Sequence, residues 1–145
     1  MESSQIQFKA WDKRTKQLYQ VKTLQFYGAN NTVDACWTNG VDFDGESTLG
    51  EPELNNLHNL MLMQYTGMKD VKGVEIYEGH IVNNGQHAYL VCFGEFADSG
   101  DFQYPTKRQT GFYIVDVHTD GTYPLYSMTY EIIGNIYENP ELLED

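Results

Sequence analysis

The chain has 145 residues, of which 41% are hydrophobic and 21% charged, and its formal net charge at pH 7 is −12. This length allows one domain or two small ones, and this composition is that of a globular protein rather than a disordered or fibrous one. Two cysteines, Cys36 and Cys92, exclude a disulfide scaffold and a zinc site of the Cys-x-x-Cys kind. The first residues resemble no signal peptide and no apolar run reaches the roughly 18 residues of a membrane span, so we expect a cytoplasmic protein.

The first part of the chain predicts strands and then a loop. Aromatic residues, 14% of the chain, favour strands, and side chains alternate between apolar and polar over residues 6–11 and again over 18–24. This pattern predicts an N-terminal β-hairpin. Residues 32–37 predict a further strand before an Asn39-Gly40 turn. From residue 42 to 59 Gly, Glu, Asn and Pro predominate, which predicts a loop with one or two helical turns after Pro52.

The second part of the chain predicts short strands joined by turns. We expect these strands, after an apolar run at 60–65, at residues 76–82, 88–93, 110–117, 122–126 and 130–137. Residues 94–105 predict a polar loop, Asp120-Gly121 a type I′ turn, and residues 141–144 a terminal helical turn. The whole pattern predicts a mainly β protein, with an N-terminal β-hairpin and loop region over residues 1–59 and a small antiparallel barrel or meander over 60–145.

Three stretches carry a resemblance to a known family. They are residues 8–12 (FKAWD), residues 63–70 (MQYTGMKD) leading into residues 75–82 (EIYEGHIV), and residues 132–143 (IIGNIYENPELL). In this order and spacing the chain resembles the YopX family of proteins encoded by bacteriophages and prophages. The resemblance implies a C-terminal SH3-like barrel and a location inside a bacterial host cell, and it implies no activity.

One residue departs from the family pattern. The family has Asp in the segment Glu-Gly-Asp-Ile-Val, and this chain has His80 there. If that Asp has a role shared by family members, this chain either lacks the role or performs it in a way that depends on pH through His80. The surrounding residues 77–82 are those of a tight turn at Gly79 that enters a strand, so we expect a structural role for the segment.

The sequence offers only weak candidates for a metal site or a catalytic site. His80 and His87 could face each other across a hairpin, but two imidazoles without a third ligand make a poor metal site. Residues 40–51 match part of a calcium loop, with Gly40 in place of the first carboxylate. Neither cysteine lies at a helix N-terminus or in a basic cluster, so nothing predicts an activated thiol. We therefore expect no enzyme activity, no metal and no cofactor.

The basic residues are clustered in a chain that is otherwise acidic. Five basic residues against two acidic ones give residues 1–22 a net charge of +3, and the rest of the chain then carries −15. We infer a possible interaction surface from two basic groups and two aromatic side chains that follow the Asp120-Gly121 turn. Its members are Lys9, Lys13, Arg14, Lys16, Lys107, Arg108, Tyr123 and Tyr126.

Three functions remain open at this point. The first is a non-enzymatic phage or prophage accessory protein that binds a protein partner and self-associates, through strand edges or through the basic hairpin on an acidic surface. The second is an acidic mimic of nucleic acid that occupies a host DNA-binding protein. The third is an SH3-like barrel that binds nucleic acid, which the net charge disfavours because phosphate binding requires Lys and Arg.

Overall fold

The computed structural model describes residues 6–13, 16–27, 32–38, 60–100, 103, 107–125 and 129–144. The chain divides into two compact units, Met1–Gln64 and Tyr65–Asp145, so the division falls inside a strand, five residues after the boundary predicted at 59/60. The described residues form ten strands and one 3-10 turn, with no α-helix, which confirms the mainly β prediction. They are β1 Phe8–Asp12, β2 Gln17–Tyr27, β3 Thr32–Thr38, β4 Leu60–Lys69, β5 Glu75–Tyr77, β6 His80–Asn83, β7 Ala88–Ala97, β8 Arg108–Asp116, β9 Thr122–Pro124, β10 Glu131–Asn135 and the 3-10 turn η3 Pro140–Leu143.

The N-terminal unit is built on the predicted hairpin. β1 pairs with β2 in antiparallel register from Lys9 opposite Gln20 to Asp12 opposite Gln17. β3 pairs with the other edge of β2, and the first half of β4 pairs with the free edge of β1. The hairpin turn closes with a hydrogen bond from Lys16 N to Asp12 O at 2.7 Å, and Lys16 has a positive φ of 57°.

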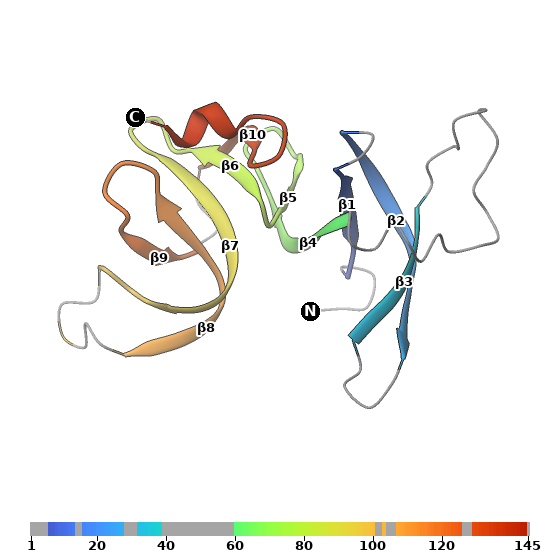
Figure 1. Ribbon diagram of the computed structural model, residues 1–145. Helices are drawn as coiled ribbons and strands as arrows, with labels where there is room; N and C mark the ends of the chain where they lie inside the picture. Colours follow the sequence, from blue (N-terminus) through green and yellow to red (C-terminus); the bar gives the residue numbers. More distant parts are fainter. Residues whose placement is uncertain are drawn as a thin grey trace. The chain divides into compact units, whose positions relative to one another are not determined.

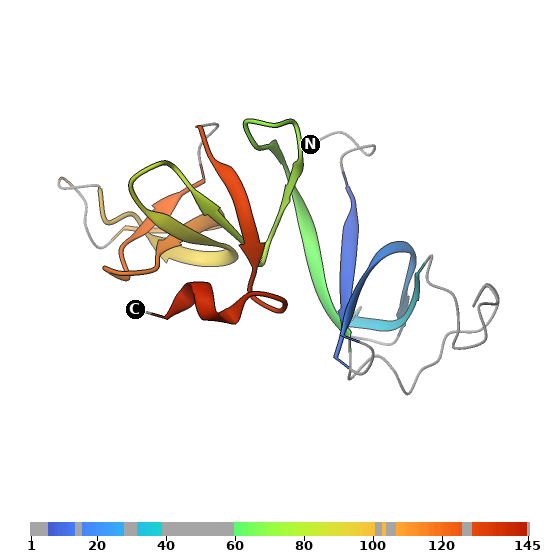
Figure 2. The same ribbon diagram turned by 90° about the horizontal axis from the view of Figure 1, so that it is seen from above.

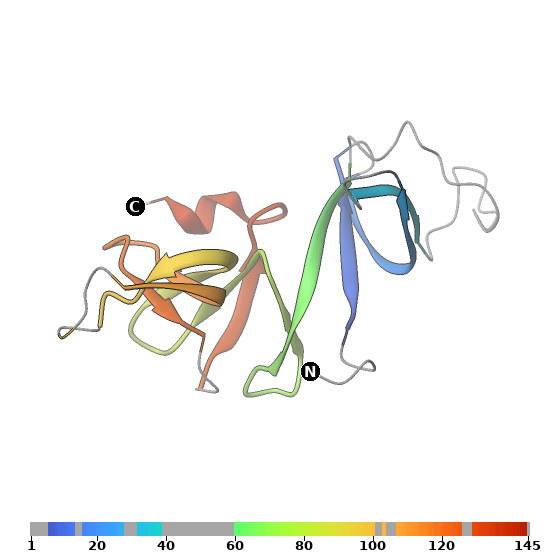
Figure 3. The same ribbon diagram turned by 90° about the horizontal axis from the view of Figure 1, so that it is seen from below.

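The C-terminal unit contains a curled antiparallel sheet in the order β10-β6-β7-β8-β9. In Figure 1 β7 and β8 follow one curve, with β9 on its inner side, and they lie side by side again in Figures 2 and 3. The end of β7 meets β9: Ser99 N donates to Thr122 O at 2.7 Å, and Thr122 N donates to Ser99 Oγ at 2.9 Å. These contacts make the sheet barrel-like, which confirms the predicted fold class.

β7 continues past the predicted strand end, because two glycines allow the curl. Gly94 lies directly opposite Gly111, with φ values of 148° and 156° that other residues rarely adopt. On one face the Phe96 and Tyr113 rings stack with centroids 4.9 Å apart. Aromatic rings packed beside paired glycines stabilise such a kink. The prediction that residues 94–105 form a loop is therefore wrong for residues 94–97, which are strand.

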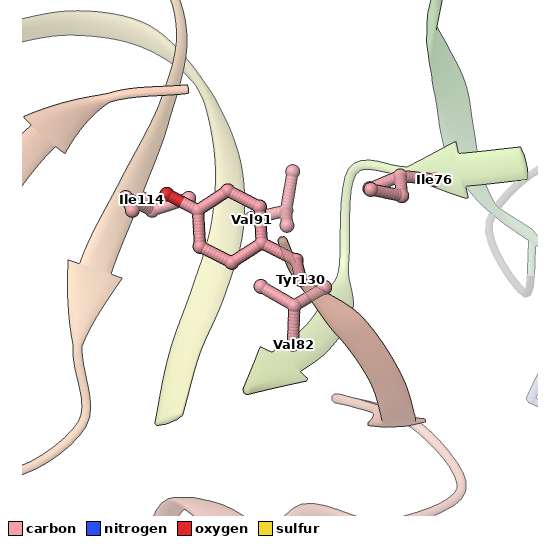
Figure 4. Close-up of a cluster of buried hydrophobic side chains, with 5 residues drawn as sticks. All are labelled: Ile76, Val82, Val91, Ile114 and Tyr130. Carbon is pink, nitrogen blue, oxygen red and sulfur yellow. The ribbon is translucent and has the colours of Figure 1, made fainter. Parts of the chain in front are cut away.

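The core of this unit surrounds the ring of Tyr130. Ile76, Val82, Val91, Ile114 and Tyr130 are at most 5% exposed and form one cluster. Figure 4 shows the Tyr130 ring in the middle of these side chains, with Ile76 reaching in from β5. The core therefore joins β5 to the curled sheet.

The turn between β8 and β9 differs from the predicted one. Asp116 N donates to Gly121 O at 2.8 Å, so the loop has four residues, and only Asp120, with φ 59°, has a positive φ. A type I′ turn has two residues and needs two positive φ values. The Asp116 carboxylate selects the longer loop because it accepts the N–H groups of His118 and Thr119 at 2.8 and 3.2 Å.

Both edges of the curled sheet are covered, which removes one reason to expect oligomers. On β10 Asp70 Oδ2 accepts Ile132 N at 3.2 Å, and Asn139 Oδ1 accepts Asn135 N at 3.2 Å. On β9 the main chain of Thr122 is bonded to Ser99. A covered edge does not invite another strand, so the exposed-edge premise is wrong for this sheet.

Several other predictions have clear outcomes. The terminal helical turn is confirmed as η3, and the strand predicted at 76–82 is divided by a turn at Glu78 and Gly79. The predicted loop at 42–59 and the partial calcium pattern lie outside the described residues, as does the side chain of Cys36. In the described part of the chain, no helix is long and apolar enough to cross a membrane.

Candidate functional site

His80 is a buried turn residue. It is 7% exposed, and its Nδ1 accepts the main-chain N–H of Tyr77 at 2.9 Å. The same turn holds β7 and β10, because Gly79 N donates to Val91 O and Ile136 N donates to Gly79 O, both at 2.8 Å. An accepting Nδ1 carries no proton, so the imidazole is neutral here. His80 therefore stabilises the turn that begins β6.

His80 and His87 do not face each other, so that hypothesis is wrong. His80 pairs with Asn135 on β10, and His87 lies in the exposed loop between β6 and β7. His87 Nδ1 instead lies 2.9 Å from Oδ2 of the buried Asp116. Burial opposes the ionised form of Asp116, but hydrogen bonds from His118 and Thr119 and the charge of His87 outweigh it and lower the pKa of this carboxyl.

The described thiol is not activated. Burial raises the pKa of Cys92, which outweighs the opposite effect of a hydrogen bond from Tyr113. A thiolate is therefore disfavoured at this position. Among the described residues no three His, Cys, Asp or Glu side chains gather as metal ligands.

The described residues of the predicted basic and aromatic surface lie on several elements of the two units. Tyr123 is half-buried: its ring packs against the core and lies edge-on to that of Tyr89, with the ring centroids 6.4 Å apart. Tyr123 pairs with Ile114 on β8, six residues along that strand from Arg108. The sheet curls, however, so that Thr122 Oγ1 donates to the main-chain oxygen of Ala97, the residue opposite Arg108. Lys107 and Arg108 are exposed at the start of β8.

The other described residues of that surface belong to the N-terminal unit. Lys13 and Lys16 are exposed at the tip of the β1–β2 hairpin, and Lys9 is half-buried on β1. Arg14 and Tyr126 lie outside the described residues.

An aromatic pair lies at the end of the predicted strand 88–93 and within the predicted strand 110–117; one ring is exposed and the other is half-buried. Phe93 on β7 is 51% exposed and lies directly opposite Phe112 on β8. Their ring centroids are 4.9 Å apart with an interplanar angle of 61°. Side chains alternate along a strand, so both rings share a face with the buried Val91 and Ile114. The core face of the sheet thus continues into a region where it is exposed.

An ion pair borders these rings on the same face. Arg108 Nε donates to Glu95 Oε1 at 2.9 Å, and the side chains are 60% and 59% exposed. We call Phe93, Phe112, Glu95 and Arg108 the aromatic surface. It combines two Phe rings and an Arg, residue types that are enriched at protein interfaces, with a locally neutral pair of charges.

A second exposed apolar group lies on the turn between β4 and β5 and on β10. Val71, Val74 and Ile133 are 57%, 50% and 41% exposed, and Ile133 lies at a bulge in β10. The Lys72–Glu131 ion pair, at 2.6 Å, links the turn to this strand. We call this group the aliphatic surface; it lacks aromatic residues and Arg.

Many acidic side chains of the C-terminal unit have partners inside the fold. Asp70 and Asp116 accept main-chain N–H groups, Glu95 and Glu131 form ion pairs, and Glu138 accepts from Asn135 at 3.0 Å. These carboxylates stabilise turns and strand pairs.

The comparisons with known proteins agree with the motifs. Residues 7–144 match the model of the family described as YopX protein. The chain belongs to the YopX family. It is similar to protein EF1440 from Enterococcus faecalis, whose crystal structure shares 28% identity and a TM-score of 0.56 over 96% of this chain and 98% of that one. No curated protein sequence matches the chain.

Membership in the YopX family confirms the resemblance and defines no activity. The match includes the turn at residues 77–80 and the curled sheet, which are the parts that position the aromatic surface. The neighbour from E. faecalis covers the same parts, because the alignment takes in nearly all of both chains.

Proposed function

We propose that this YopX-family protein is a non-enzymatic binding module of the bacterial cytoplasm, encoded by a phage or prophage, that works by self-association. The single observation behind the proposal is the aromatic surface: a Phe ring half exposed to water on a protein of net charge −12. Aromatic residues and Arg are enriched at sites where proteins meet, and here they lie together on one face of two paired strands.

The chemistry of the candidate nucleophile and bases supports a non-enzymatic role. Burial raises the pKa of Cys92, and His87 Nδ1 is engaged by Asp116. A nucleophile needs an adjacent base within hydrogen-bond reach, and this thiol and imidazole instead have structural partners.

The two nucleic-acid functions have less support. Binding by the barrel needs a continuous basic and aromatic face, whereas the C-terminal unit has only four basic residues against thirteen acidic ones. The acidic mimic needs spaced free carboxylates, and many described ones have internal partners.

The test is the molar mass of the full chain by light scattering across a hundredfold range of concentration. A self-associating protein gives a mass that rises from that of one chain toward that of two. A mass of one chain at every concentration would contradict the proposal. A direct shift of DNA in a gel, lost at high salt, would favour the nucleic-acid-binding barrel instead.

A further inference from the structure

We infer that two copies of this chain pair through the aromatic surface about a two-fold axis, with Glu95 of each copy facing Arg108 of the other. This inference rests on the proposed self-association and names the surface that carries it. The occupant of the surface is therefore a second copy of the chain.

The surface is complementary to itself. A two-fold interface brings the same patch of both subunits together, so it must be able to pair with its own copy. The aromatic surface has an acidic side chain and a basic one on opposite strands, with the two rings beside them. Rotation by half a turn places each carboxylate opposite a guanidinium and the rings opposite rings.

The net charge of the unit favours association through a region whose own charges cancel. Residues 65–145 hold four basic and thirteen acidic residues, a net charge of −9, so two such units repel each other. The aromatic surface has one charge of each sign and is locally neutral. Repulsion between copies is therefore reduced there, as it is at the aliphatic surface, which also carries one ion pair.

Arg108 has donors for a second carboxylate. In the described part of the chain its hydrogen bond to Glu95 uses Nε. A guanidinium has five N–H donors in a fixed fork, so its terminal nitrogens can bind the carboxylate of the other copy. The Glu95–Arg108 pairs of two copies can thus join in a network of four charges.

The aliphatic surface is the strongest rival and is also the matched control. It has exposed apolar side chains and an ion pair, Lys72–Glu131, with exposures of 68% and 47%. Aromatic residues and Arg dominate the energy of binding in interfaces, whereas Val and Lys contribute little. The aromatic surface is favoured for this reason.

The experiment measures association by sedimentation velocity for two single charge reversals, Glu95→Arg and Arg108→Glu, alone and mixed. Each variant alone places like charges opposite each other in the pair, so we expect association at least about tenfold weaker than that of the unchanged chain. An equimolar mixture restores opposite charges across the axis, and we expect it to associate within about threefold of the unchanged chain.

The controls separate the surface from the function. Lys72→Glu and Glu131→Lys each reverse one charge of the ion pair on the aliphatic surface, and we expect them to leave association unchanged. We expect Val71→Ser, also on the aliphatic surface, to leave association unchanged and Phe93→Ser, on the aromatic surface, to weaken it. Thermal melts confirm that each variant is folded. If the unchanged chain associates and the Glu95 and Arg108 variants associate equally well, or their mixture fails to recover, the inferred surface is wrong while self-association stands. If the unchanged chain is a monomer at every concentration, the proposed function fails, and this inference fails with it.

Discussion

Asp70 shows how one buried carboxylate can organise distant parts of the chain. Its Oδ1 accepts Lys72 N and Val74 N, both at 2.9 Å, and its Oδ2 accepts Ile132 N, 62 residues later. Burial opposes its ionisation, but these three N–H groups and the charge of Lys72 outweigh burial and lower its pKa. The ionised side chain thus holds the β4–β5 turn against the edge of β10.

Replacement of Asp70 by Ala is expected to destabilise the protein by about 3 kcal/mol, because buried N–H groups lose a charged acceptor. Since the folded pKa is lowered, the stabilisation is complete above the unfolded pKa of about 3.9 and is lost as pH falls below it. Denaturant unfolding from pH 7 to pH 3 measures both effects. The unchanged chain should lose more stability over this range than Asp70→Ala, and an equal loss in both would contradict this role. Asp98→Ala, which removes an acceptor for Gly100 N in a loop, is the control.

His80 does in this chain what an Asp carboxylate can do at the same turn. Both side chains can accept the N–H of Tyr77, which His80 Nδ1 binds at 2.9 Å. We expect His80→Asp to keep the melting temperature within a few degrees and His80→Leu to lower the free energy of unfolding by about 2 kcal/mol, the cost of an unpaired buried N–H. Thermal melts at pH 8, where imidazole is neutral, compare the three proteins. A stable Leu variant would show that the hydrogen bond is dispensable.

At the scale of elements, the β7–β8 pair depends on Gly94 and Gly111. A side chain at either position would meet nothing within 4 Å, so space does not explain these glycines. Their φ values of 148° and 156° explain them, because a Cβ disfavours this backbone. The two glycines thus let a long pair of strands bend and bring the end of β7 to β9.

Gly94→Ala and Gly111→Ala are therefore each expected to cost about 1–3 kcal/mol of stability, although the new methyl group meets no atom. Equilibrium unfolding in urea gives the change. Thr110→Ala, an exposed position next to Gly111 on the same strand, should change stability by less than about 0.5 kcal/mol. If the Gly variants are as stable as the Thr110 variant, the curl does not depend on glycine.

Local patterns predicted most strands, and long-range contacts account for the errors. The hairpin of β1 and β2 and the turn at Gly79 follow from alternation and turn residues. The extension of β7 through Gly94 could not be predicted, because it requires a glycine opposite it on β8 and the stacking of Phe96 on Tyr113. The Asp116 loop was mistaken for a tight turn, since Asp120-Gly121 is a type I′ signature and the Asp116 side chain overrides it.

The candidate site was the least predictable part. The place of Tyr123 after a turn favours exposure, whereas packing against Tyr89 and the core leaves it half-buried. Phe93 gave no signal, because alternation along a strand predicts that an apolar residue on the core face is buried. Its exposure depends on which other residues pack over it in the folded unit, and the local sequence does not contain that information. Phe93 and Phe112 at mirrored positions around the paired glycines are the only hint in the sequence.

At the scale of the molecule, charge and exposed apolar surface have opposite effects on association. A net charge of −12 favours repulsion between copies, and in the proposed pair the copies meet at the locally neutral aromatic surface. Salt screens the general repulsion and also the Glu95–Arg108 contacts, while contacts between Phe rings persist. The proposed association is therefore expected to depend mainly on the rings, with the charges setting the orientation of the two copies.

The most direct measurement is the change of main-chain amide NMR shifts when a concentrated ¹⁵N-labelled sample of the full chain is diluted. The account predicts that the largest changes occur in residues 92–97 of β7 and 108–113 of β8, the strands that carry the aromatic surface. Changes confined to the β1–β2 hairpin or to the turn at residues 70–74, or spectra that do not change with concentration, would contradict it.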